Sequence, residues 1–138
     1  MAEGILNHLG AKRFQACSAG SFPSGEVHPL SLATLRGHGI VTEGFRSKSW
    51  DEFRDRPIDI VITVCDNAAN ESCPIFSGAP IKAHWGAPDP AHFHGTAAET
   101  AAEFERVFSI LERRVKALLE LPYDSIDQQA LQAIGHLI

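Results

Sequence analysis

An apolar run rich in valine and isoleucine, Ile58–Cys65, restricts the possible folds more than any other part of the sequence. Apolar side chains at successive positions of a strand indicate that both of its faces are covered, as in parallel sheets flanked by helices. The run therefore predicts an inner strand of a parallel sheet, with Cys65 at its carboxyl end.

Helix and strand patterns alternate along the rest of the chain. Apolar spacing, capping residues and glycine stops predict helices over residues 1–10, from Pro29, from Ser49, from Thr96, and from Ser125 to Gly135. Further strands are expected over Arg13–Gly20 and, at an edge, over Ala79–Gly86. This alternation predicts one α/β domain across residues 1–138, with a parallel sheet and helices on both of its faces. In such folds ligands bind at the carboxyl ends of the strands.

The longest predicted helix begins at Thr96, which forms a capping-box spacing with Glu99. An apolar stripe along one face indicates burial against a core. The stripe consists of Ala101, Phe104, Phe108, Leu111, Val115 and Leu118.

Composition excludes several classes of partner. The formal net charge is −5, and the chain has neither a lysine cluster nor an arginine stripe, which argues against nucleic acid. No apolar stretch has the length of a membrane span, and the first residues lack the pattern of a signal peptide. Three cysteines without an export signal favour reduced thiols in the cytoplasm.

Two of the cysteines, Cys65 and Cys73, lie eight positions apart. Zinc sites usually bring cysteines two to four residues apart, and the histidines His92 and His94 do not complete such a spacing, so no metal site is expected. A redox dithiol fits better, although a buried Cys65 with an incidental Cys73 remains open because free cysteines are commonly buried. Cys17, within a strand-like run, is expected in the core.

The loop after the edge strand holds a candidate acid, Asp89, between Pro88 and Pro90. Prolines restrict the backbone on both sides, and a carboxyl group in a stiff loop at the ligand end of a sheet can act as a general acid. An ordinary turn aspartate is the alternative. His84 and Trp85 fit either a wall of the site or plain packing.

The segment VCDNAANESCP, followed by HWGAPDP, resembles the thiol-dependent arsenate reductases built on the low-molecular-weight protein tyrosine phosphatase fold. The resemblance covers essentially the whole chain and implies a three-layer α/β/α fold with a small parallel sheet. It implies that a first cysteine attacks arsenate, that Cys65 is the second thiol and Cys73 the third, and that Asp89 is the acid. It also implies an external reductant, thioredoxin or alternatively glutathione with glutaredoxin, and no bound cofactor.

One part of the family pattern is missing from the sequence. No cysteine is followed by arginine in the Cys-x5-Arg spacing that holds the oxyanion in this family. The resemblance implies that the central first strand and the oxyanion loop precede Met1, as after a start codon assigned at an internal methionine. We therefore expect little or no activity from the 138 residues alone, and self-association through unpaired strand edges.

Two other functions stay open at this stage. A phosphotyrosine phosphatase of the same fold would use Asp89 in the same way but would give Cys65 and Cys73 no role. A non-catalytic protein that responds to redox state or to an oxyanion is the other alternative.

Overall fold

The structure, a computed structural model, describes residues 1–19, 25–64 and 80–137. Four helices, two strands and three short 3-10 turns are found in these residues. The helices are α1 (Ala2–Gly10), α2 (Pro29–Gly37), α4 (Ala97–Glu120) and α5 (Gln128–Ile134). The strands are β1 (Ile60–Thr63) and β2 (Ile81–His84), and the turns are η1 (Trp50–Phe53), η2 (Pro90–His92) and η3 (Tyr123–Ser125).

The two strands pair in parallel, as the sequence predicted, with Ile60 opposite Ile81 and Thr63 opposite His84. Every residue of β1 is only partly buried, however, so the prediction that both of its faces are covered is wrong for the described structure. Among the described residues β2 is the only strand that pairs with β1. Part of the apolar surface of β1 therefore stays accessible.

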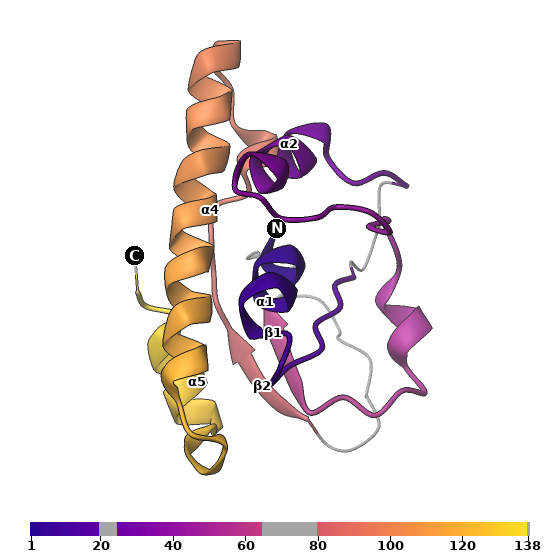
Figure 1. The fold of residues 1–138 in the computed structure, drawn as a ribbon, viewed down its shortest axis with the longest axis vertical. Coiled ribbons are helices and arrows are strands. Elements are labelled where there is room, and N and C mark those ends of the chain that lie inside the picture. Colours follow the sequence, from indigo (N-terminus) through magenta and orange to yellow (C-terminus); the bar gives the residue numbers. More distant parts are fainter. Residues whose placement is uncertain (20–24, 65–79, 138) are drawn as a thin grey trace.

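Helix α4 runs the length of the molecule, with α2 beside its amino-terminal half and α5 beside its carboxy-terminal half (Figure 1). Its start confirms the predicted capping box, because the Thr96 side chain accepts from the Glu99 N–H and the Glu99 carboxylate accepts from the Thr96 N–H. The predicted stripe is buried from Phe104 onward, but Ala101 is exposed, because the core begins only at the third turn of the helix.

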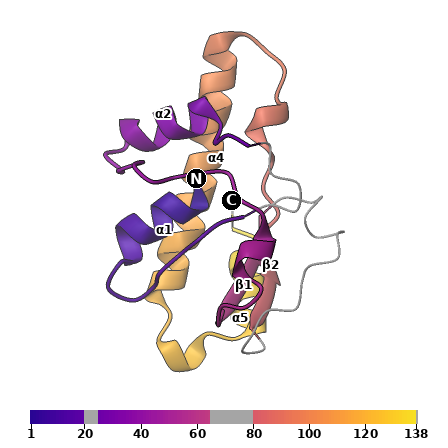
Figure 2. The ribbon, with the colours of Figure 1, turned by 90° about the vertical axis from the view of Figure 1, so that its right-hand side faces the viewer.

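Two apolar clusters lie on α4. The first joins α4 to α1 and α2 around Ile5, Leu35 and Phe108. The second joins α4 to β2 and α5 around Leu118, Trp85 and Leu131. Figure 2 shows the result, with α1 and α2 on one side of α4 and the strands on the other.

The segment expected as a strand over Arg13–Gly20 forms none in its described part, residues 13–19. The side chain of Asn7 takes both backbone groups of Ala16: its Nδ2 donates to the Ala16 carbonyl at 2.9 Å, and its Oδ1 accepts from the Ala16 N–H at 2.8 Å. A strand needs a ladder of such bonds with a neighbouring strand. A single amide side chain supplies one rung and no ladder.

Two helix starts also differ from the expected ones. Helix α5 is capped by Asp127, whose carboxylate accepts from the Ala130 N–H, rather than by Ser125. Ser49 caps the turn η1 as expected, but the carboxylate of Glu52 bonds Arg46 instead of closing a capping box. In both places a partner that is close in space displaces the one suggested by sequence spacing.

Candidate active site at the carboxyl ends of the strands

The carboxyl ends of β1 and β2 lie side by side and are joined beyond the strands themselves. The Trp85 N–H donates to the Thr63 carbonyl at 2.7 Å, and the Ala87 N–H donates to the Val64 carbonyl at 2.8 Å. Val64 directly precedes Cys65, and Ala87 begins the approach to Asp89. The backbone therefore brings the Asp89 loop against the residue that precedes the first cysteine of the pair. Cys65 and Cys73 themselves lie outside the described residues.

Asp89 sits at the start of η2 with 44% of its side chain exposed. One carboxylate oxygen accepts from the Ala91 N–H at 3.0 Å, and the other lies 3.5 Å from Nδ1 of His92. Both contacts are local to the turn. The carboxylate is thus held at a defined place but remains open to solvent, which a group that exchanges protons with a bound molecule requires.

The two aromatic residues before this loop have different roles. Trp85 is buried, and its indole N–H donates to the Leu131 carbonyl at 2.7 Å, so it packs in the core rather than lining a site. The ring of His84 lies partly buried, with Nδ1 2.6 Å from the Thr63 hydroxyl oxygen. This side-chain contact ties the last residues of the two strands together.

Arg114 is a functional candidate that the sequence reasoning missed. It lies on α4, three positions after Leu111 and therefore on the apolar stripe, and only 4% of it is exposed. Its guanidinium donates to the carbonyls of Trp85 and Gly86. These two residues begin the loop that leads from β2 to Asp89, and they are called the root of the Asp89 loop below. A charged residue on an otherwise apolar helix face was the available signal, because such residues are rarely buried without a specific partner.

Cys17 is exposed, so the expectation that it lies in the core is wrong. Its run forms no strand, and no sheet covers it in the described structure. Desolvation by the surrounding chain raises the pKa of its thiol, and this effect outweighs the nearby positive charges of Arg56 and Lys48. Because the thiolate is the nucleophilic form, Cys17 is poorly suited to the role of the attacking cysteine.

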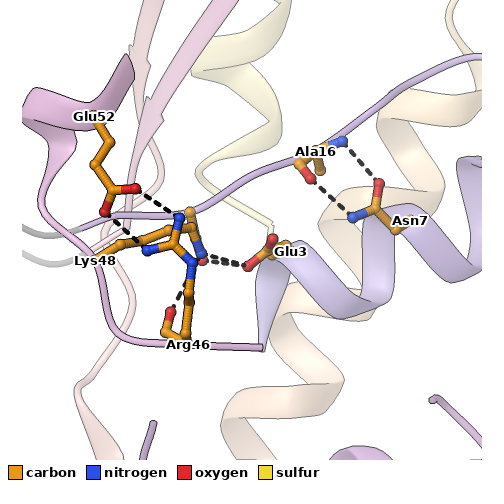
Figure 3. A network of polar contacts seen from close by, with 7 residues as sticks. Glu3, Asn7, Ala16, Arg46, Lys48 and Glu52 are labelled. Carbon is orange, nitrogen blue, oxygen red and sulfur yellow. Dashed lines mark hydrogen bonds and ion pairs between the residues drawn. The ribbon is translucent and has the colours of Figure 1, made fainter. Parts of the chain in front are cut away.

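A polar network surrounds the first turn of α1 (Figure 3). The Glu3 carboxylate accepts from the Ser18 hydroxyl at 2.5 Å and lies 3.7 Å from the ammonium of Lys48, whose side chain is 8% exposed. The Lys48 ammonium also donates to the Arg46 carbonyl. A small cavity of about 50 Å³ adjoins this network and is lined in part by Glu3, Ser18 and Arg46. Sequence spacing did not predict this polar network, because its residues come from separate segments of the chain.

In the described part of the chain, no group of three or more His, Cys, Asp or Glu side chains could hold a metal ion. His92 and His94 are exposed there. Within residues 1–19, 25–64 and 80–137, no helix combines the length and apolar character that crossing a membrane requires.

The described fold is a parallel pair of strands packed with the long helix α4, with the Asp89 loop at the carboxyl ends of the strands. The chain belongs to the family described as low molecular weight phosphotyrosine protein phosphatase, whose model matches residues 1–132. The predicted α/β class with a small parallel sheet is thereby confirmed.

Three relatives of known name and one solved structure similar to this chain are arsenate reductases. Those of Bacillus licheniformis, Halalkalibacterium halodurans and Bacillus subtilis are 35%, 32% and 31% identical to this chain, and each alignment covers 87% of this chain and 85% of the relative. A solved structure of an arsenate reductase in the reduced state superimposes with a TM-score of 0.66 and 26% identity, covering 85% of this chain and 83% of the other. The family resemblance inferred from the cysteine segment is confirmed.

Proposed function

We propose that this protein reduces arsenate to arsenite by a relay of thiols, with Cys65 as the second thiol, Cys73 as the third and Asp89 as the general acid. The observation that carries the proposal is the bond from the Ala87 N–H to the Val64 carbonyl. It joins the Asp89 loop to the residue before Cys65. Similarity to three arsenate reductases supports the choice of substrate.

The proposed relay passes two electrons from thioredoxin to arsenate through three thiols. A first thiolate displaces an oxygen of arsenate, to which Asp89 donates a proton, and a sulfur–arsenic bond forms. Cys65 then attacks the first sulfur, so that a disulfide forms, the sulfur–arsenic bond breaks and its electron pair reduces arsenic to arsenite. Cys73 attacks Cys65, which frees the first thiol and leaves a Cys65–Cys73 disulfide. Thioredoxin returns two electrons to this disulfide.

The first thiolate is the part that these 138 residues do not supply. They contain no Cys-x5-Arg, and Cys17, the one described cysteine, has a raised pKa. We propose that the 138-residue chain alone does not turn over arsenate and that an upstream segment with a strand and a Cys-x5-Arg loop restores turnover. The assay measures arsenite formation with thioredoxin, thioredoxin reductase and NADPH. An active 138-residue chain, or an inactive extended one that carries the loop, would contradict the proposal.

A phosphotyrosine phosphatase is the second candidate, favoured by the description of the matching family. It would use the same acid but would not need the two cysteines. In the extended protein, Cys65→Ser should abolish arsenate reduction and leave hydrolysis of an aryl phosphate unchanged. If the unsubstituted extended protein hydrolyses the aryl phosphate but does not reduce arsenate, the phosphatase function replaces the reductase; arsenate reduction that survives Cys65→Ser would contradict the role of Cys65.

We further propose that the 138-residue chain self-associates and works in the cytoplasm. The described residues place no strand on the far side of β1, and a strand edge with free backbone groups pairs readily with another chain. A thiol relay needs a reducing compartment. Light scattering should detect dimers or larger assemblies, and a monomer with a cooperative melt at high temperature would contradict the self-association.

A further inference from the structure

The carboxyl end of β2 is attached to the two carboxy-terminal helices at three consecutive residues. Gln132 of α5 bonds both backbone groups of His84, accepting from its N–H at 3.1 Å and donating to its carbonyl at 3.2 Å. The Trp85 indole donates to the Leu131 carbonyl. The carbonyls of Trp85 and Gly86 both accept from Nη1 of Arg114, at 3.0 and 3.2 Å.

Arg114 is the central residue of these contacts because its side chain donates hydrogen bonds to two segments at once. While Nη1 holds Trp85 and Gly86, Nε donates at 2.9 Å to the carbonyl of Leu137, beyond the end of α5. The planar guanidinium offers donors in fixed directions, which suits it to bridge carbonyls of different segments.

The acceptors of Arg114 are unusual for a buried cation. None of the ion pairs found among the described residues includes it, and its hydrogen-bond acceptors in this part of the chain are backbone carbonyls. Burial lowers the pKa of Arg114, but a guanidinium stays charged in proteins. Burying a charge costs free energy. The position of Arg114 against Trp85 and Gly86 therefore indicates a function that an apolar side chain of similar length would not perform.

We propose that Arg114 is a positioning residue that fixes the root of the Asp89 loop at the carboxyl end of β2. Its link to the reaction rests on the function proposed above. Gly86 is three residues from Asp89, and η2, which follows Asp89, packs on the same helix. With its root on Arg114 and its far end on α4, the loop holds Asp89 two residues beyond Ala87, whose N–H donates to the carbonyl of Val64.

The experiment compares Arg114→Met, Arg114→Lys and the control Arg106→Met by amide hydrogen exchange of the 138-residue chain. Arg106 is on the same helix but is half-exposed and paired with Glu103. Arg114→Met should speed exchange at residues 86–93 by roughly tenfold or more, the factor expected when hydrogen bonds to a charged donor are lost. Exchange in α1 should stay unchanged. Arg114→Lys should be intermediate, since it keeps a donor near Trp85 and Gly86 and loses the one to Leu137.

Equal acceleration in α1 and in residues 86–93 would overturn the proposal, because Arg114 would then support stability in general. No acceleration in Arg114→Met, or the same acceleration in Arg106→Met, would also overturn it. In the extended protein, Arg114→Lys should lower kcat for arsenate with KM nearly unchanged, because the acid acts in the chemical step. Absence of any turnover in the unsubstituted extended protein would contradict the proposed function and leave the exchange result standing, so the two failures are distinguishable.

Discussion

Two backbone segments of this protein are held by the same device and have different structures. At His84 the amide of Gln132 pairs with the backbone N–H and carbonyl, and at Ala16 the amide of Asn7 does the same. His84 is the last residue of a strand, whereas Ala16 lies in a segment without regular structure. The difference is the neighbour on the other side: β2 has β1, and residues 14–19 have no strand partner in the described structure.

A side-chain amide can therefore replace one rung of a sheet but cannot make a strand. At the β2 end it adds to an existing ladder and helps to place the Asp89 loop. At Ala16 it helps to keep the segment against α1, together with the bond from the Ser18 hydroxyl to Glu3. The end of β2, which β1, α4 and α5 all contact, is called the braced side below, and the segment of residues 14–19, which has no strand partner in the described structure, is called the open side.

The largest effect should come from emptying part of the core on α4, the helix that contacts both α1 and α5. Phe108 of α4 is 1% exposed and stacks on His38 at 3.9 Å. Phe108→Ala should lower the free energy of unfolding by about 3–5 kcal/mol, because a large buried ring is replaced by a cavity. Urea denaturation measures it, with Phe93→Ala, at a residue 37% exposed, as the control. Equal losses in the two variants would contradict the burial assigned to Phe108.

One added methyl group should disrupt the packing of the braced side. A Cβ added at Gly135 would lie 2.8 Å from the His84 carbonyl oxygen and 2.9 Å from Cδ1 of Trp85. Gly135→Ala should therefore cost about 1–3 kcal/mol, the usual effect of overpacking. Gly37→Ala is the matched control, since no atom lies within 4 Å of its Cβ position. Thermal melts of the two variants should differ, and an unchanged Gly135→Ala protein would show that α5 does not press on the strand end.

The two amides provide the sharpest test of the comparison. Asn7→Ala should release residues 14–19, whereas Gln132→Ala should leave β2 in place because β1 still pairs with it. Each should cost about 1 kcal/mol for the lost hydrogen bonds. Hydrogen exchange separates them: protection at Ala16 should disappear in the first variant, and protection in β2 should persist in the second. Loss of β2 protection in Gln132→Ala would make the two segments equivalent after all.

The smallest effect should come from a surface ion pair near the open side (Figure 3). The hydrogen bond from Arg46 lowers the pKa of Glu52, and partial desolvation opposes it. Because the folded pKa is the lower one, the stabilisation is present above the unfolded value of about 4.3 and is lost as pH falls through the folded pKa. Comparing Glu52→Gln with the parent chain should show a small difference at neutral pH that vanishes in acid and shrinks with salt. A difference that grew as pH fell would contradict this sign.

Much of the scaffold could be predicted because its signals are local. The parallel pairing of β1 with β2 and the capping box at Thr96 follow from residue type and spacing. The failures involve hydrogen-bond partners that residue type and spacing do not reveal. The Asn7 amide prevented the expected strand at Ala16, and Asp127 replaced Ser125 as a cap. Arg114 was missed because its acceptors are backbone carbonyls, which leave no trace in sequence.

For the candidate site, too, some residues could be predicted from the sequence and others could not. Asp89 was found from the two prolines beside it, and the structure places its loop beside Val64. Trp85 proved to be packing, and Cys17 proved to be exposed. The roles of Cys65 and Cys73 rest on the resemblance and on the family, and they remain predictions.

The most direct test of the thiol relay is to map the disulfide in the 138-residue chain. The protein is oxidised with diamide, its free thiols are alkylated, and its peptides are identified by mass spectrometry before and after treatment with thioredoxin, thioredoxin reductase and NADPH. We predict a single disulfide between Cys65 and Cys73 that thioredoxin reduces, with Cys17 alkylated throughout. A disulfide that involves Cys17, or a Cys65–Cys73 bond that thioredoxin leaves intact, would contradict the relay.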